Sequence, residues 1–101
     1  MELNENEVLI RKSRATHRKG IEGVGGKLYL TNQRLYFKSH FFNIQSHEET
    51  IPIQSIDYIK AEGSDFLSAK MSIHLKSGAV EIFHIPKRKE WVHAVQNSLK
   101  N

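Results

Sequence analysis

The side chains with the clearest potential for chemistry are three histidines and two glutamates. His17, His40 and His47 could supply imidazole nitrogens to a zinc ion, and the adjacent carboxylates of Glu48 and Glu49 could add oxygens. No pair of these residues has the spacing of a known zinc motif, and two consecutive glutamates in an extended segment point apart. The sequence therefore predicts no metal site, and nothing in it requires a cofactor.

A structural role is predicted for two of these histidines. The stretch 39–50, SHFFNIQSHEET, has no sustained period and is predicted to be a long loop with at most a short piece of strand. A loop without a ladder of its own must satisfy its amides elsewhere. We therefore predict that His17, His40 and Asn43 form a polar cluster that hydrogen-bonds backbone groups where this loop crosses the first strand.

The sequence offers no arrangement for nucleophilic catalysis. It contains no cysteine and no Gly-x-Ser-x-Gly turn, and its only paired carboxylates are Glu48 and Glu49. The glycine-rich run GVGGK lacks the Ser or Thr of a phosphate-binding loop and precedes a strand rather than a helix. Without an acid, base or nucleophile constellation, the sequence predicts a noncatalytic protein.

Basic residues provide the candidate binding chemistry. Lys12, Arg14 and Arg18 share one parity of the stretch 8–19, VLIRKSRATHRK, so they face water together in an extended strand. Their cationic groups suit phosphate oxygens. Together with Lys38 they are candidate ligand-binding residues for an anionic surface, and the alternative is a basic strand that is only solvated.

Phe41 and Phe42 complete this candidate site. Adjacent residues in an extended loop point to opposite sides, so one ring is predicted to enter the core and the other to stand exposed near Lys38. An exposed aromatic ring beside cations suits a lipid interface or a protein partner. The alternative is that the second ring packs under the loop itself.

The elements that would position these residues are mostly strands. The stretch 25–38, GGKLYLTNQRLYFK, alternates apolar and polar residues on both sides of an Asn-Gln pair that suits a tight corner. Further strands are predicted at 8–19, with a bulge or bend near Arg11 and Lys12, and at 51–53, 55–61, 71–75 and 80–85.

The two ends of the chain differ from this strand pattern. Residues 1–7 read as a polar lead-in, and residues 87–100 change to a period of about 3.6, which indicates an amphipathic helix. Such a helix would cap a curled antiparallel sheet of six or seven strands, so the fold class is mainly β with one α-helix. The predicted core consists of Leu28, Leu30, Leu35, Phe37, Ile53, Ile56, Met71, Ile73, Leu75, Ile82, Trp91, Val95 and Leu99.

Composition supports a single domain over residues 1–101. The 101 residues are 39% hydrophobic and 26% charged, which fits a globular chain, and no stretch approaches a membrane-spanning length. The acidic N-terminus is no secretory signal, and the lack of cysteine fits a reducing cytosol, so a cytoplasmic location is predicted. A net charge of +4 permits an anionic partner, but the cations are too few and too scattered to favour nucleic acid.

The sequence also resembles a known family. The run VGGKLYLTNQRLYFKSHFFNIQ, preceded by Ala15-Thr16-His17 and followed by IPIQSIDYI, resembles a bacterial GRAM domain. The segment IHLKSGAVEIF and Trp91 on the following helix continue a match that runs from Val8 to Leu99. The resemblance implies a pleckstrin-homology-like fold, in which a curled barrel of about seven antiparallel strands is capped by a C-terminal helix. It also implies a module that binds lipid or protein, often phosphoinositides in eukaryotes.

These observations predict a noncatalytic binding module. The first hypothesis is association with anionic lipid or a membrane surface, which would make the protein peripheral at the membrane. The alternative is a protein-interaction or self-association module that uses an exposed strand edge. The sequence does not specify an oligomeric state.

Overall fold

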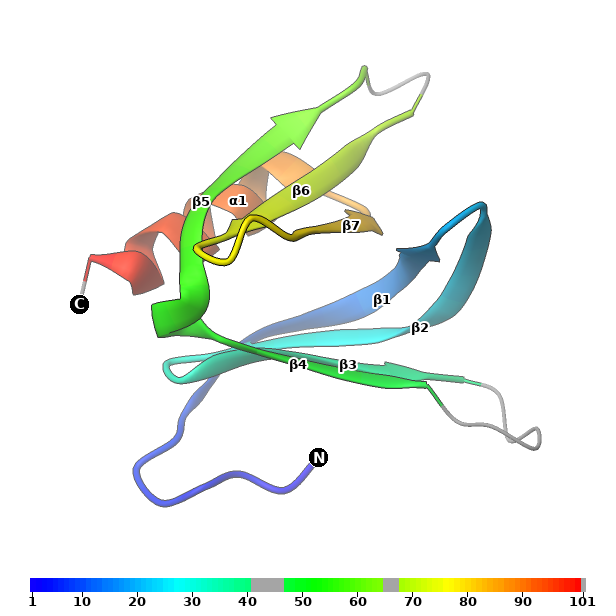
Figure 1. Cartoon of the computed structure of the whole chain (residues 1–101). Coiled ribbons are helices and arrows are strands. Elements are labelled where there is room, and N and C mark those ends of the chain that lie inside the picture. Colours follow the sequence, from blue (N-terminus) through cyan, green and yellow to red (C-terminus); the bar gives the residue numbers. More distant parts are fainter. Residues whose placement is uncertain (41–46, 65–67, 101) are drawn as a thin grey trace.

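The computed structural model describes residues 1–40, 47–64 and 68–100, which form seven strands, one 3-10 turn and one α-helix (Figure 1). The elements are β1 (Leu9–Lys19), β2 (Glu22–Thr31), β3 (Arg34–Ser39), β4 (Glu48–Pro52), η1 (Ile53–Ser55), β5 (Ile56–Glu62), β6 (Lys70–Leu75), β7 (Val80–His84) and α1 (Arg88–Leu99).

All seven strands belong to one antiparallel sheet with the order β4-β3-β2-β1-β7-β6-β5. Every neighbouring pair except β1–β7 is consecutive in the chain. The sheet curls into two halves, β1–β4 and β5–β7, and the chain passes from one half to the other through η1 (Figure 1). The predicted mainly β fold, with about seven curled antiparallel strands and a C-terminal helix, is therefore confirmed.

The central hairpin forms as its alternation predicts. β2 and β3 pair Leu28 with Phe37 and Leu30 with Leu35, and all four side chains are buried. Five further residues of the predicted core are also buried, namely Ile56, Met71, Ile73, Trp91 and Val95. Three others, Ile53, Leu75 and Leu99, are partly buried and pack against this core. The apolar alternation of the hairpin therefore locates the inner side of the sheet.

The strand β7 buries a different side chain from the one predicted, and a register shift changes which residues of β5 face inward. In β7, Phe83 and the following Ile85 are buried while Ile82 is only half-buried, so the prediction for Ile82 is wrong. The sequence VEIFHI has apolar residues on both parities, and the pairing of Phe83 with Met71 selects the inner one. In β5 a register shift after Ile56 turns Ile59 inward and leaves Tyr58 exposed.

The fourth strand begins earlier than predicted. β4 starts at Glu48 and pairs along β3, from Lys38–Glu48 to Arg34–Pro52, so the predicted loop 39–50 is shorter than expected. Ile53, predicted to be in the strand, starts η1 instead. Pro52 lies on an edge strand, as its missing amide hydrogen requires.

The C-terminal helix follows a sharp turn. Pro86 precedes Lys87, which has a left-handed conformation with φ 57°, and α1 then packs against β5 and β6. Arg88, in the first turn of this helix, is buried although it is charged. Its guanidinium donates hydrogen bonds to the carbonyls of Glu62 and Gly63 at 2.9 and 2.7 Å, which ties the start of the helix to the end of β5.

A bulge in β1 lies where the change of parity predicts it. Leu9 pairs with Thr31 and Arg11 with Leu30, so Ile10 is the extra residue of β1. After this bulge, Lys12 and Arg14 lie on the outer side of the sheet, while the alternate residues lie on the inner side. The bulge therefore decides which cations of this strand are available to a ligand.

Gly26 provides a test of the packing between β2 and β3. A Cβ atom there would lie 2.3 Å from the carbonyl oxygen of Lys38 and 2.6 Å from the ring of Phe37. Gly26→Ala should therefore lower the free energy of unfolding by about 1–3 kcal/mol, because backbone must move to admit the methyl group. Gly25→Ala is the matched control, since its nearest neighbouring atom is 4.0 Å away. Equal stabilities of the two variants in urea titrations would contradict this close approach.

Candidate functional site

The candidate cations lie on the outer side of the first half of the sheet. We call the group Lys12, Arg14, Arg18, Lys27 and Lys38 the basic face. Register places Arg14 opposite Lys27 and Lys27 opposite Lys38, so three cations form a row across β1, β2 and β3. Cations directly opposite one another on neighbouring strands repel, which destabilises a sheet. The basic face is therefore a concentration of positive charge that the fold itself does not favour.

Aromatic rings and one acid accompany the basic face. Tyr29 and Tyr36 form the adjacent cross-strand pair, with ring centroids 6.0 Å apart, and Tyr29 is opposite Lys12. Glu48 on β4 accepts a hydrogen bond from the Tyr36 hydroxyl at 2.8 Å and lies 3.5 Å from the ammonium of Lys38. Burial, followed by the bond to Glu48, raises the pKa of Tyr36 to about 12, so its hydroxyl stays protonated.

The structure brings together four of the six predicted ligand-binding residues. Lys12, Arg14 and Arg18 share the outer side of β1, and Lys38 lies two strands away on the same side. Phe41 and Phe42 lie outside the described residues. Sequence reasoning missed Lys27, although the parity signal was available because it alternates with the buried Leu28 on the central hairpin.

A second polar group links β1, β7 and the residue before β4, near the other end of β1. His17, only 2% exposed, is 2.7 Å from His47 through Nδ1 and 2.7 Å from the carboxylate of Glu81 through Nε2. Because a carboxylate only accepts, Nε2 of His17 carries the hydrogen, and His47 then donates from its own Nε2 to Nδ1. The ring of Phe83 stacks on His17 at 4.6 Å, which completes its burial.

This group differs from the predicted polar cluster. The side chain of His17 bonds two other side chains rather than backbone groups. His40 is exposed, and its backbone amide donates to the carbonyl of Gly25 at 3.0 Å. Asn43, the third predicted member, lies outside the described residues. Within those residues no group of three potential ligands is arranged to hold a metal ion.

The histidine pair predicts a pH dependence of stability. Burial, followed by the positive charge of Lys19 and the contact with His17, lowers the pKa of His47 below its ordinary 6.5, although Glu49 and Glu81 act in the opposite direction. The unfolded chain therefore binds this proton more readily, and stability falls as the pH falls below 6.5. His47→Gln should remove most of the loss between roughly pH 7 and pH 5. Urea titrations across this range would contradict the assignment if the variant and the wild type lost stability equally.

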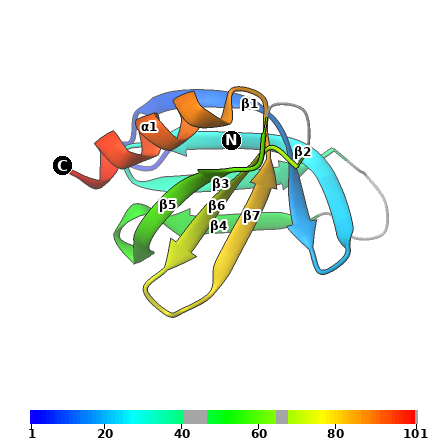
Figure 2. The ribbon, with the colours of Figure 1, turned by 90° about the horizontal axis from the view of Figure 1, so that it is seen from above.

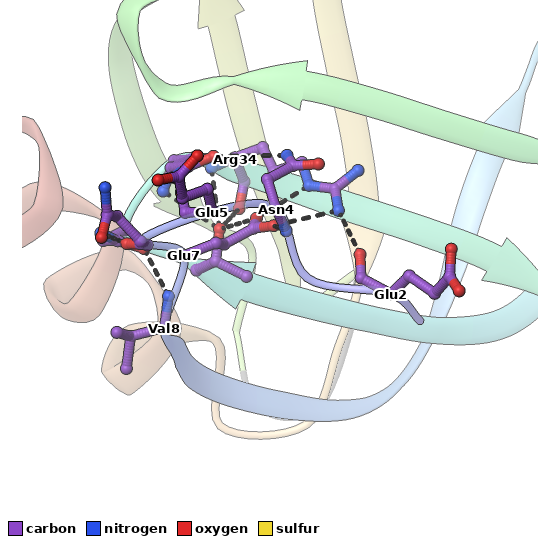
Figure 3. A network of polar contacts seen from close by, with 10 residues as sticks. Glu2, Asn4, Glu5, Glu7, Val8 and Arg34 are labelled. Carbon is purple, nitrogen blue, oxygen red and sulfur yellow. Dashed lines mark hydrogen bonds and ion pairs between the residues drawn. The ribbon is translucent and has the colours of Figure 1, made fainter.

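The N-terminal segment, predicted to be a lead-in, is anchored to the β2–β3 turn (Figure 3). The side chain of Glu7 is fully buried; Oε2 accepts from Arg34 Nε at 2.8 Å and from the hydroxyl of Thr31 at 2.6 Å. Asn32 accepts from the amide of Val8 at 2.7 Å. Asn32 and Arg34 also line a cleft of about 890 Å³.

One further trio has the residue types of a catalytic site but lacks the required bonds. The hydroxyl of Ser72 donates to the carboxylate of Glu62 at 2.5 Å, while Nε2 of His74 is 3.3 Å away. A nucleophilic serine must instead donate to its histidine base. Ser72 is also buried, and the bond joins neighbouring strands, so it contributes to the pairing of β5 and β6.

Comparison with solved structures finds the same fold in proteins of low sequence identity. The C-terminal domain of an unknown protein from Leishmania infantum has a TM-score of 0.80 and 15% identity, over 96% of this chain and 88% of that one. The Vps36 N-terminal PH domain has a TM-score of 0.75 and 19% identity, over 99% of this chain and 87% of that domain's chain. The Slm1 PH domain in complex with phosphoserine has a TM-score of 0.71 and 14% identity, over 92% of this chain and 97% of that domain's chain.

The remaining comparisons concern the sequence itself. No helix of the described structure has the length and apolar character needed to cross a bilayer. A search of curated proteins finds no match. The family model of the GRAM domain matches residues 1–101. With its pleckstrin-homology-like neighbours and its capped seven-stranded sheet, the chain belongs to the GRAM domain family.

Proposed function

We propose that this GRAM domain is a noncatalytic module that associates peripherally with anionic membrane surfaces through the basic face. The observation that carries the proposal is the row of Arg14, Lys27 and Lys38 in direct cross-strand register. The repulsion within this row is relieved when the cations meet a surface of opposite charge. In a cell, the protein would then be a cytoplasmic protein that binds peripherally to the membrane surface.

The shape of the basic face favours an extended surface over a single small ligand. Its cations come from three neighbouring strands and point outward, so they form a plane rather than converge on one point. Each Lys or Arg near an anionic bilayer contributes about 1 kcal/mol, which makes several cations sufficient for weak, salt-sensitive binding. Tyr29 and Tyr36 add amphipathic rings of the kind found at membrane interfaces. The Slm1 PH domain, a structural neighbour, was solved with phosphoserine, which is itself an anionic phosphate ligand.

The test is co-sedimentation with vesicles of phosphatidylcholine alone and with added phosphatidylserine, at low and at high salt. We expect binding only to the anionic vesicles at low salt. The double variant Lys27→Glu and Lys38→Glu should reduce this binding at least about tenfold, because it reverses two charges on the basic face.

A matched control separates position from net charge. Lys60→Glu combined with Lys76→Glu changes the net charge equally at exposed positions on β5 and after β6, and it should bind nearly as well as wild type. Phe41→Ser and Phe42→Ser in the same assay test the proposal that one of these rings adds an aromatic contact. If the wild-type protein does not bind anionic vesicles even at low salt, lipid association is wrong.

A further inference from the structure

The edge of β1 that faces away from β2 is open over its first half. In the described structure its register with β7 contains only the pairs Thr16–His84 and His17–Phe83. Pro86 has no amide hydrogen to extend this ladder, and the left-handed Lys87 turns the chain away into α1. The first residues of β1 therefore have a strand neighbour on the β2 side alone.

The orientation of the amides on this edge follows from a bond elsewhere in the sheet. The carbonyl of Gly25 accepts from the amide of His40 on the β3 side, so Gly25 turns its backbone groups away from β1. Its partner Thr16 must then direct its amide and carbonyl toward β7. Alternate residues share this direction, so Lys12 and Arg14 present their amides and carbonyls to the open edge.

The beginning of β1 lies beside α1 (Figure 2). A groove lies between the two elements, at the start of this open edge. Its volume is about 540 Å³, with Ile10 and Arg11 on the strand side and His93 and Ala94 on the helix side. Ile10 is 50% exposed, and Val8 and Leu9 beside it are 61% and 38% exposed. Consecutive exposed apolar residues on an open edge promote pairing with another chain, which proteins otherwise avoid.

The charges around the groove are mainly positive. Lys12 and Arg14 flank the open edge on the outer side of the sheet, and Arg11 and Lys89 line the groove itself. Glu90 is the acidic residue among the described lining residues, and its carboxylate is 3.7 Å from the Arg11 guanidinium in a partly exposed pair. Such pairs are weak, so the groove keeps an excess of positive charge.

We propose that this groove binds an extended segment of a partner protein, which adds to β1 as a further strand. Because successive side chains of a strand alternate between faces, those on the outer side would lie beside Lys12 and Arg14 and those on the inner side would enter the apolar groove. The segment it fits therefore alternates acidic and apolar residues. A second copy of this chain fits poorly, since two β1 edges would bring cations against cations.

The probe is the capped peptide acetyl-Glu-Val-Glu-Leu-Glu-Val-Glu-amide, added to the full chain labelled with nitrogen-15. We expect saturable binding, with chemical shift changes along residues 9–14 and slower hydrogen exchange at the amides of Lys12 and Arg14. The same peptide methylated on alternate backbone nitrogens is the matched control, because it keeps every side chain but cannot form the ladder. A peptide with lysine in place of glutamate should not bind.

Variants of the chain locate the site. Ala94→Glu places a bulky anion in the groove and should abolish binding of the acidic peptide, and Lys89→Glu should weaken it by about threefold or more. Lys38→Glu, two strands from β1, should leave peptide binding unchanged while it weakens vesicle binding, so the two proposals fail separately. No binding at millimolar peptide, or shift changes on β4 or β5 instead of β1, would overturn this assignment. A concentration-dependent dimer that protects the same amides would show that a second copy occupies the edge.

Discussion

Replacing Arg34 by leucine should lower the free energy of unfolding by about 3–5 kcal/mol, because it leaves a buried carboxylate without its cation. The side chain of Glu7 is fully buried, and Arg34 meets it through Nε at 2.8 Å and Nη2 at 3.2 Å. Arg34 also donates to the carbonyl of Glu2 at 2.9 Å, so the same change releases the N-terminal segment (Figure 3). Urea denaturation followed by circular dichroism measures the loss.

Two further variants define the cause of this loss. Lys38→Leu removes an exposed pair with Glu48 and should cost no more than about 1 kcal/mol, which separates burial from charge alone. Combining Glu7→Leu with Arg34→Leu should recover much of the stability, since no uncompensated charge then remains inside. If Arg34→Leu and Lys38→Leu were equally mild, the pair would not anchor the N-terminal segment.

The ion pair also predicts behaviour in acid. The bond from Arg34 holds the pKa of Glu7 at about 2, below its ordinary 4.5. The unfolded chain therefore takes up this proton first, and the stabilisation present above pH 4.5 is lost as the pH falls toward 2. This loss of stability occurs at lower pH than the loss caused by His47, and it should be absent in the Arg34→Leu variant.

Replacing Trp91 by alanine should also cost about 3–5 kcal/mol, because it empties the largest buried side chain of the core. Trp91 has no measurable exposure, and α1 presents it to the sheet beneath the guanidinium of Arg11, 5.4 Å from its ring. The loss should appear as a lower urea midpoint by circular dichroism, since the only tryptophan is no longer available as a fluorophore. An unchanged midpoint would mean that α1 is not needed to close the sheet.

Trp91→Phe is the informative control for this change. The indole Nε1 of Trp91 is buried and has no hydrogen-bond partner among the described residues. Phenylalanine is smaller than tryptophan and leaves a small cavity, which costs stability. It also removes the buried unpaired N–H donor, and this gain partly offsets the cost of the cavity. The phenylalanine variant should therefore be much closer to wild type than the alanine variant.

The parts of the fold that the sequence predicts well depend on local alternation. The hairpin of β2 and β3 places Leu28, Leu30, Leu35 and Phe37 inside because each strand has only one apolar parity. The same reasoning predicts a bulge or bend near Arg11 and Lys12, and the register shift lies just before them, at Ile10. It also finds α1, where the period changes from two to 3.6 after Pro86.

The missed features depend on contacts between distant residues. Glu7 and Arg34 have no periodic signal, and a polar N-terminus looks the same whether it is solvated or buried. The pairing of His17 with His47 and Glu81 depends on where β4 and β7 lie in the sheet, which one sequence does not reveal. For the candidate site, parity predicted which cations of β1 face outward, but the register between strands was needed to align Arg14 with Lys27 and Lys38.

The meander order of the sheet has a consequence for how the chain folds. Five of its six strand contacts join neighbours in the sequence and need only short loops to close. The sixth joins Thr16 and His17 to His84 and Phe83 through just two residue pairs. Closing this long loop costs much chain entropy, and few hydrogen bonds form in return. We therefore expect the hairpins to form early in folding and the β1–β7 junction to form late. In the transition state the halves β1–β4 and β5–β7 would already be formed but still separate.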